Sequence, residues 1–348
     1  MICHFATLFD QNYLSRGLCL IESLDRVLNN SYSLYILALD ENVVDYFAKH
    51  KRDNITVLTL SQLEGFYPEL SAAKNNRSKV EYYFTLSPIL PLYILENFKD
   101  CDRITTLDSD IYFYATPAEI FSSYDKDAVL ITPHDFSSRL QDLARYGKYN
   151  VSFQSFPNTI NGLSVLKDWK EKCITWCYDY QDEKTGYYAD QKYLDDWQQN
   201  FDHVKSIDLK TCGRAPWNIS DTAITVSNDS FLIGNKPLIY YHFHSLRIND
   251  RCVTHGLQGY EINGISIGVK KVYSTYILAL YKYNKQINQL GDKAVIRINI
   301  NSKSSNILQF ILRTEIGAIV LSSKKVLFFN LKIKTNLIRL RNYLKWQN

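Results

Sequence analysis

The sequence predicts an α/β fold, in which a mixed, mainly parallel sheet is flanked by helices and followed by a basic, partly helical C-terminal appendage. Strand and helix signals alternate through the first half of the 348 residues, a pattern typical of strands joined by right-handed crossovers. Basic residues outnumber acidic ones from Lys270 to the end, whereas Asp and Glu concentrate in the first two thirds. We therefore expect a main domain over 1–260 and a basic, aromatic extension over 261–348.

Short runs rich in β-branched and aromatic residues predict the strands, and stretches with apolar residues at helical spacing predict the helices. In chain order we expect a strand over 2–8, a helix over 14–27, a strand over 33–39, a helix over 43–50, a strand over 55–60, a helix over 80–98, and strands over 103–114 and 128–132. The helix over 80–98 has to tolerate Pro88 and Pro91 near its middle.

Segment 136–161 is polar, aromatic and irregular, which predicts a loop or lid rather than a core element. Periodic apolar residues then predict two helices, and alternation predicts one more strand, at 169–180, 190–201 and 237–243. In the extension we expect a helix, strand-like alternation and a basic apolar stretch, at 272–283, 294–300 and 327–346.

Composition and charge exclude several classes of protein. With 46% hydrophobic residues, only 13 Gly and 8 Pro, the chain has no room for an extensive disordered region. A net charge of +4 does not call for nucleic acid as a partner. The seven cysteines lack framework spacing, the N-terminus lacks a secretory signal, and no apolar run reaches the roughly eighteen residues of a membrane span. We therefore expect a cytoplasmic protein.

The decisive feature is the triplet Asp108-Ser109-Asp110, which follows an apolar strand signal. Ligands of a parallel sheet bind at the carboxyl ends of its strands, where this triplet is expected. Side chains at positions i and i+2 of an extended segment point the same way, so the two carboxylates can share one hard divalent cation. Such an ion, Mn²⁺ or Mg²⁺, would neutralise a diphosphate leaving group as a Lewis acid. Taken alone, however, an Asp-x-Asp triplet also occurs in many surface turns.

The run LDSDIYFY around this triplet resembles the Asp-x-Asp segment of glycosyltransferase family 8 and of bacterial lipopolysaccharide galactosyl- and glucosyltransferases. That resemblance implies a GT-A fold, which is Rossmann-like, and a catalytic role for 1–260. The opening FATLFDQNY is similar to the family's first strand and loop, where Ala6, Asp10, Asn12 and Tyr13 would contact the nucleotide. A plain strand ending in a helix-capping loop explains the same residues equally well.

The pair Asp190-Gln191 resembles the family's Asp-Gln segment, which faces the donor sugar, although Asp at a helix start also fits N-capping. In retaining members the Gln lies beneath the anomeric carbon. The resemblance therefore implies that Gln191 stabilises an oxocarbenium-like centre and that Asp190 binds donor hydroxyls. If the enzyme inverts instead, Asp190 becomes the first candidate for the base that deprotonates the acceptor.

The segment YYHFHS at 240–245 resembles the family's His-aromatic segment, which supplies a third metal ligand. A neutral imidazole can complete a site begun by two carboxylates. Strand alternation points His242 and His244 to the same side, so either could be the ligand, and family position favours His242. The resemblance also places Arg247 near the diphosphate.

The chain departs from the family pattern in two places. Relatives have an Asn two residues before a Gly in the sugar-binding loop, whereas this chain has Asn161 directly before Gly162, and Asn161 is its candidate donor contact. The family's Gly-x-x-Lys-Pro-Trp segment is missing. By contrast, three segments look like those of a largely uncharacterised bacterial subgroup of nucleotide-diphospho-sugar transferases: 176–179, 190–197 and RAPWNI at 214–219. The resemblance spans roughly residues 1–250.

Together these resemblances imply a hexosyltransferase that uses a nucleotide-diphosphate sugar, UDP-linked by preference, in bacterial surface polysaccharide or lipopolysaccharide assembly. The acceptor is expected to be a glycan or glycolipid, and the basic extension could lie on the inner face of an anionic cytoplasmic membrane or pack on the catalytic domain. A catalytically inactive relative would have lost a metal carboxylate or the Asp-Gln pair, and both are present. A nucleotidyltransferase should show a Gly-rich phosphate loop near the first strand, which this chain lacks.

Overall fold

The computed structural model describes residues 2–228, 230–248, 252–260, 262, 266–289, 318–322 and 325–329. Its centre is a seven-stranded sheet in the order β3-β2-β1-β4-β7-β6-β8. The strands of this sheet are β1 Cys3–Phe9, β2 Tyr32–Ala38, β3 Ile55–Thr59, β4 Arg103–Leu107, β6 Val129–Pro133, β7 Tyr149–Pro157 and β8 Val204–Ser206. All neighbours are parallel except β7, which is antiparallel to both β4 and β6. The prediction of a mixed, mainly parallel sheet flanked by helices is thus confirmed.

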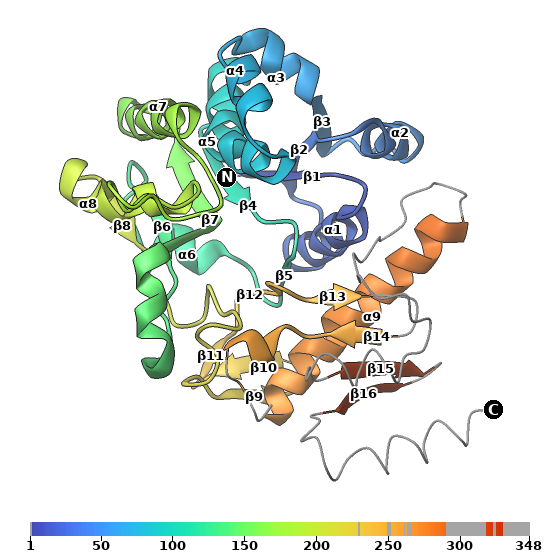
Figure 1. Ribbon diagram of the computed structural model, residues 1–348. Coiled ribbons are helices and arrows are strands. Elements are labelled where there is room, and N and C mark those ends of the chain that lie inside the picture. Colours follow the sequence, from blue (N-terminus) through green and yellow to red (C-terminus); the bar gives the residue numbers. More distant parts are fainter. Residues whose placement is uncertain are drawn as a thin grey trace.

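Helices cover both faces of this sheet (Figure 1). One core lies under α3 Leu60–Phe66, α4 Leu70–Asn76, α5 Lys79–Asn97 and α7 Ile160–Thr175. The other lies under α1 Leu14–Leu28 and α2 Glu41–Lys49. Alternation along β1 divides the two, because Ala6 packs into the first core and Phe5 into the second. Short helices follow the later strands: α6 Ala118–Ser122, α8 Trp197–Asn200 and the 3₁₀ helices η1 Ser138–Tyr146, η2 Gln191–Asp196 and η3 Leu257–Tyr260.

Two of the helix starts show why the chain folds as it does locally. Helix α5 begins with a capping box, in which Ser78 accepts from the backbone N–H of Glu81 and the Glu81 carboxylate accepts from the N–H of Ser78. Burial along its length then outweighs the cost of Pro88 and Pro91, which both lie inside the helix as predicted. Helix α2 is capped by Asp40, which accepts from the N–H of Val43.

Segment 136–161, predicted as a loop, contains a central strand of the sheet, so that prediction is wrong for β7. The polar residues of β7 misled it, since they are buried and hydrogen-bonded to the neighbouring strand. The hydroxyls of Ser155 and Thr105 lie 2.8 Å apart, and Thr106 donates to Gln154 at 3.2 Å. A buried polar group is tolerated when it is paired in this way. The part before β7 holds the 3₁₀ helix η1 Ser138–Tyr146, so the predicted loop is confirmed only for the few residues on either side of η1.

The predicted strand over 103–114 is two strands. β4 ends at Leu107, and β5 Ile111–Phe113 leaves the main sheet to pair with β12 Tyr240–His242. The predicted strand over 237–243 is likewise divided between β11 Lys236–Pro237 and β12. Both predictions placed the residues in extended structure but missed the breaks.

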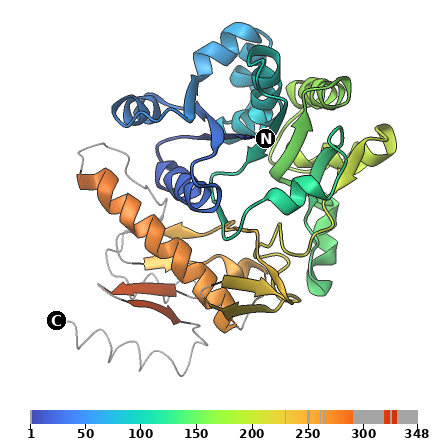
Figure 2. The same ribbon diagram turned by 180° about the vertical axis from the view of Figure 1, so that it is seen from behind.

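Smaller sheets and a long helix complete the described chain. β9 Ile224–Ser227, β10 Ser230–Ile233 and β11 form one sheet, and β13 Arg247–Ile248, β14 Cys252–Thr254, β15 Ala318–Ser322 and β16 Lys325–Phe329 form another. The predicted helix over 272–283 is confirmed within the longer α9 Ile267–Gln289, which packs on α1 and runs diagonally below it in Figure 2. Its residues Tyr273 and Tyr276 are fully buried.

Two expectations for the extension meet the limits of the described residues. The strand-like alternation over 294–300 lies outside them, and so does the basic stretch over 327–346 apart from the three residues at the end of β16. Among the helices that are described, none combines the length and apolar character needed to cross a bilayer.

Candidate metal centre and donor site

Strand pairing brings the Asp-x-Asp triplet and His242 together. The triplet forms a turn after β4, closed by a hydrogen bond from the Ile111 N–H to the Asp108 carbonyl at 3.2 Å. β5 then pairs with β12 so that Ile111 lies opposite His242. The N–H of Phe243 also donates to the Asp110 carbonyl at 3.0 Å. The carboxylates therefore converge through a turn, and the extended i, i+2 geometry expected from the sequence is not what aligns them.

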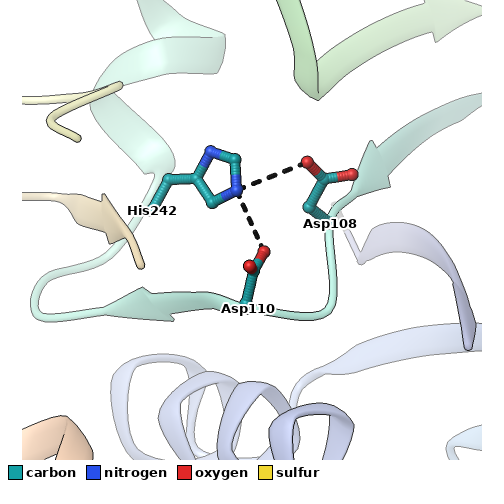
Figure 3. Close-up of side chains that lie close together, drawn as sticks. All are labelled: Asp108, Asp110 and His242. Atoms are coloured by element: carbon teal, nitrogen blue, oxygen red, sulfur yellow. Dashed lines mark ion pairs between the residues drawn. The ribbon is translucent and has the colours of Figure 1, made fainter. Parts of the chain in front are cut away.

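The three side chains form one group of ligand atoms (Figure 3). His242 Nε2 lies 3.0 Å from Asp110 Oδ1 and 3.5 Å from Asp108 Oδ2. All three ligand atoms lie within 4.8 Å of one another, and within the described residues this is the one such group of His, Cys, Asp or Glu. The side chain of His242 is 6% exposed, whereas that of Asp108 is 41% exposed. The group is thus closed on the imidazole side and open on the Asp108 side.

The electrostatics of this group suit a cation. Burial disfavours the charged form of Asp110, but the imidazole of His242, with His244 and Arg16, lowers its pKa to about 2. Burial likewise lowers the pKa of His242, but the two carboxylates outweigh it and raise that pKa overall. The two carboxylates therefore favour a positive charge next to them. Two carboxylate oxygens and one imidazole nitrogen are a ligand set that fits Mn²⁺, while Mg²⁺ prefers oxygen throughout.

Of the two candidate histidines, His242 is the one grouped with both carboxylates. The ring of His244 lies 5.6 Å from that of His242, at 82° to it. Burial and the charge of His242 lower the pKa of His244 to about 4, so that His244 is neutral near pH 7. The alternation of β12 was predicted to give both side chains the same direction, and both rings indeed lie against Trp217, at 5.3 and 5.4 Å between ring centres.

The loop after β1 lies at the same edge of the sheet as the metal group, because β1 and β4 are parallel neighbours. The Asp10 carboxylate accepts from the backbone and side-chain N–H groups of Asn12 at 3.0 and 3.2 Å. Lys79, at the start of α5, reaches Asp10 at 3.4 Å. Ala6 is fully buried within β1, between β2 and β4.

Tyr13 and Arg16 lie between this loop and the metal group. The Tyr13 ring is 44% exposed, and the Arg16 guanidinium lies 4.3 Å from its centre. Arg16 is itself buried, donates to the Leu246 carbonyl at 2.9 Å, and helps to lower the pKa of Asp110. Sequence reasoning did not identify Arg16, because nothing in its place on an amphipathic helix distinguishes it from a surface arginine.

Asp190 and Gln191 lie at the start of η2 and are held by hydrogen bonds to other elements. Asp190 is 2% exposed and accepts a hydrogen bond of 2.5 Å from Ser87 of α5, a residue that the sequence did not point to. Burial raises the pKa of Asp190 to about 7, against the Ser87 hydrogen bond and with a contribution from the charge of Asp108. The side-chain amide of Gln191 donates to the Tyr146 carbonyl at 2.9 Å.

One predicted site residue, Asn161, lies elsewhere. β7 is antiparallel to β4, so Phe153 lies opposite Leu107 whereas Pro157 lies opposite Arg103. Asn161 follows Pro157 at the start of α7, at the opposite edge of the sheet from the triplet. The structure therefore does not bring Asn161 to the site. Arg247 is exposed at the start of β13, directly after the Leu246 carbonyl that binds Arg16.

Comparison with known proteins finds two groups of similar chains, one by sequence and one among solved structures. No family model matches the sequence. It is 26% identical over 285 residues to the uncharacterized protein YfnD of Bacillus subtilis (strain 168), covering 82% of this chain and 90% of that protein. It is 28% identical over 256 residues to the uncharacterized protein YfnF of the same organism, covering 71% and 83%.

Among solved structures, the galactosyltransferase LgtC in complex with donor and acceptor sugar analogues is similar, with a TM-score of 0.48 and 13% identity over 70% of this chain and 87% of that one. The glycosyltransferase GlyE of Streptococcus pneumoniae TIGR4 has a TM-score of 0.46 and 12% identity, over 84% of this chain and 64% of GlyE.

Proposed function

We propose that this protein is a metal-dependent glycosyltransferase of the GT-A type, which moves a hexose from a nucleotide-diphosphate sugar to a glycan or glycolipid acceptor. The observation that carries the proposal is the convergence of Asp108, Asp110 and His242 at the carboxyl end of a mainly parallel sheet. Ligands of open α/β sheets bind at that edge. The sequence resemblance to family 8 supports a UDP-linked donor and a place in bacterial surface polysaccharide synthesis.

A divalent cation bound by these three residues would neutralise the diphosphate as it leaves. The chain's own residues prepare that event. The 3.0 Å contact between His242 and Asp110 keeps two ligands together, and the open side of Asp108 leaves room for phosphate oxygens. Tyr13, partly exposed beside Arg16, could pack on the nucleotide, and Lys79 beside Asp10 adds a positive charge at the same edge.

Burial of Asp190 favours retention over inversion. A base for an inverting reaction must reach the acceptor hydroxyl, whereas Asp190 is 2% exposed and already bonded to Ser87. Gln191 is held through its amide nitrogen by the Tyr146 carbonyl, an anchor suited to a group that has to stay still beneath an anomeric carbon. In this proposal Gln191 stabilises the oxocarbenium-like centre, and the burial of Asp190 also argues against the contact with donor hydroxyls that the resemblance implies.

We place the acceptor at an anionic membrane surface or on a soluble glycan, with the extension over 261–348 as the contact region. On the described part of that extension, α9 exposes four lysines together with Leu278 and Tyr281: Lys270, Lys271, Lys282 and Lys285. A basic face with apolar side chains is what a peripheral membrane contact requires. The proposed location is therefore the cytoplasmic side of a membrane.

The experiment is a screen of nucleotide sugars for hydrolysis that depends on Mn²⁺ or Mg²⁺, followed by NMR of the anomer released or transferred. Wild-type protein should turn over at least one UDP-hexose, and Asp110→Ala should abolish turnover while the protein stays folded. Asp142→Ala, which changes an exposed acid on η1, is the matched control. Turnover retained by Asp110→Ala would overturn the site. Tight donor binding with no turnover by the wild type would instead indicate an inactive sugar-nucleotide binder.

A further inference from the structure

Trp217 is the centre of a ring cluster beside the metal group. Its indole is 4% exposed and lies across three imidazoles, with ring centres 5.1 Å from His134, 5.3 Å from His242 and 5.4 Å from His244. The contact with His242 is edge-on, at 83°. Trp217 belongs to the RAPWNI segment, which the resemblance to family 8 does not explain.

The outer nitrogen of His242 has no hydrogen-bond partner within the described part of the chain. His242 Nε2 faces the carboxylates, while its Nδ1 is buried and unpaired. A metal-binding histidine usually donates its second ring N–H to a carboxylate or carbonyl, and that bond fixes the orientation of the ring. In this protein the orientation of the His242 ring has to be fixed by packing instead, and the ring packs on the indole of Trp217.

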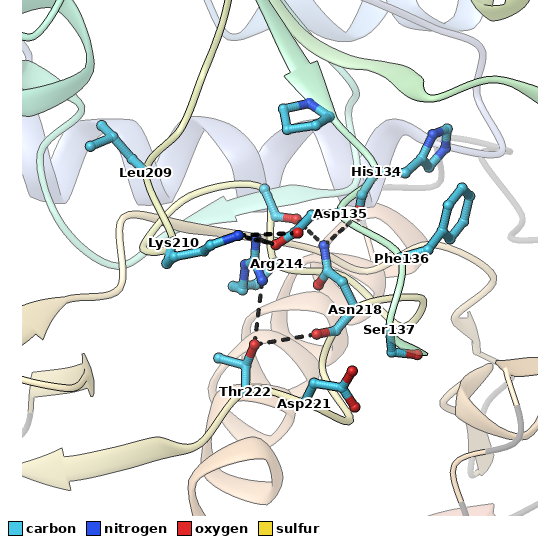
Figure 4. Close-up of polar contacts among 12 residues, drawn as sticks. His134, Asp135, Phe136, Ser137, Leu209, Lys210, Arg214, Asn218, Asp221 and Thr222 are labelled. Carbon is cyan, nitrogen blue, oxygen red and sulfur yellow. Dashed lines mark hydrogen bonds and ion pairs between the residues drawn. The ribbon is translucent and has the colours of Figure 1, made fainter. Parts of the chain in front are cut away.

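The loop that carries Trp217 is itself tied down (Figure 4). The buried guanidinium of Arg214 forms a 2.8 Å ion pair with Asp135 and also donates to Thr222 at 3.3 Å. The side chain of Asn218 donates to the carbonyls of His134 and Gly213, both at 2.8 Å. The same loop touches the metal strand directly, because the Arg214 carbonyl accepts from the N–H of His242 at 2.8 Å.

We propose that Trp217 is a positioning residue for the metal centre, holding the His242 ring with Nε2 toward Asp108 and Asp110, and that the Arg214–Asp135 ion pair holds Trp217 in place. The inference rests on the proposed function, since it requires a cation at Asp108, Asp110 and His242. Without the indole, the His242 ring turns about its side-chain bonds, and the third ligand is correctly placed for only part of the time. A loss of that kind lowers the affinity for the metal ion rather than the stability of the fold.

The test measures Mn²⁺ binding to the purified protein without substrate, from the EPR signal of free Mn²⁺. Trp217→Leu should raise the Kd for Mn²⁺ by about 10- to 100-fold, the range found when a residue that orients a metal ligand is replaced. Trp197→Leu is the matched control, because Trp197 is also fully buried with an unpaired indole N–H but packs on Phe156 and Trp169. It should lower the Tm at least as much and leave the Mn²⁺ Kd unchanged.

A second pair of variants tests the ion pair without touching the core. Asp135→Asn should weaken Mn²⁺ binding in the same direction as Trp217→Leu, but less. Asp25→Asn should not, although it also breaks an ion pair, the more exposed one between Asp25 and Arg52 at 2.6 Å. Trp217→Phe, which restores an aromatic wall, should recover part of the affinity lost in Trp217→Leu.

The outcomes separate this inference from the proposed function. If wild-type protein binds no Mn²⁺, both fall. Binding of Mn²⁺ by the wild type and its loss in Asp110→Ala would support the proposed function. If Trp217→Leu then binds Mn²⁺ as tightly as the wild type, or if Trp197→Leu lowers the affinity equally, only the positioning role of Trp217 is overturned. A selective loss in Trp217→Leu and Asp135→Asn supports it.

Discussion

His242 lies directly opposite Ile111 in the antiparallel pair of β12 and β5, and this places its imidazole 3.0 Å from Asp110, the residue before Ile111. The group of Asp108, Asp110 and His242 is therefore assembled by strand register. A slip of one residue would turn every side chain of β12 to the other face. In that register, Tyr241 would replace His242 beside the carboxylates.

The first prediction separates the two histidines. His242→Gln should weaken the Kd for Mn²⁺ by at least about tenfold, because it removes the nitrogen grouped with both carboxylates. His244→Gln should change that Kd by less than about threefold, since His244 is not part of the group. Titration of each variant by EPR or calorimetry decides it. Equal losses in both variants would show that the two imidazoles share the ion.

The second prediction concerns pH and Asp190, whose carboxyl is buried with a pKa raised to about 7. A pKa higher in the folded than in the unfolded state means that the folded protein binds the proton more tightly. The resulting stability is complete below about pH 4 and is lost as the pH rises through about 7. Asp190→Asn removes this loss, so above pH 7 it should be more stable than the wild type, by on the order of 4 kcal/mol for a pKa raised from 3.8 to about 7.

Urea unfolding in EDTA at about pH 5 and about pH 8 measures this difference. The gap between Asp190→Asn and wild type should widen toward the higher pH. Asp196→Asn, at an exposed position in the next turn, should differ from the wild type in unfolding free energy by the same amount at both pH values. A constant gap for Asp190→Asn would mean that the buried carboxyl does not titrate in this range.

The third prediction concerns the hydrogen bond from Ser87 to Asp190, which stabilises the charged carboxylate and opposes the effect of burial. Ser87→Ala should raise the pKa of Asp190 further and move the pH at which stability is lost to a higher value. NMR of ¹³C-labelled aspartate carboxyls follows this directly. Ser164→Ala, on α7, is the control, because its hydroxyl donates only to a helix carbonyl. An unchanged Asp190 titration in Ser87→Ala would contradict the prediction.

The sequence predicts the parallel half of the fold well because those strands are apolar and short, and amphipathic helices separate them. β1, β2 and β3 were all expected within a few residues of their observed bounds. β7 was not, because its buried side chains include Ser and Gln, and their hydrogen bonds exist only once β4 lies beside them. Polar residues in a short segment predict that it is exposed. In β7, hydrogen bonds to the neighbouring strand allow the same residues to be buried.

The three residues of the candidate metal centre were predictable, whereas their arrangement was not. Spacing and resemblance identified Asp108, Asp110 and His242, but the turn that converges the carboxylates and the register that brings in His242 depend on contacts distant in sequence. Arg16, Ser87 and Trp217 act through such contacts as well. Their neighbours in sequence give no sign of what they touch.

The fourth prediction contrasts two asparagines that the resemblance places at the donor. Asn12 is bonded to Asp10 at the carboxyl edge of the sheet, whereas Asn161 lies at the opposite edge. Asn12→Ala should raise the KM for the nucleotide sugar by about tenfold, the loss expected from one or two hydrogen bonds. Asn161→Ala should leave it within about twofold. A large effect at Asn161 would mean that the α7 start reaches the donor in the working enzyme.

The last prediction asks whether α9 folds together with the sheet domain or as an appendage. Gly268, in the first turn of α9, lies so close to β9 that an added Cβ would come within 1.9 Å of the Ile224 carbonyl oxygen. Gly268→Ala therefore forces backbone apart from backbone, and overpacking of that kind costs about 1–3 kcal/mol, more than the roughly 1 kcal/mol that Ala gains over Gly in a helix. Gly65→Ala in α3 is the control, since nothing lies within 4 Å of its added Cβ, and it should be neutral or stabilising.

If α9 belongs to the same cooperative unit as the sheet, Gly268→Ala lowers the single urea midpoint measured by both tryptophan fluorescence and circular dichroism. Two separate transitions, with only the lower one moved, would show instead that α9 unfolds on its own.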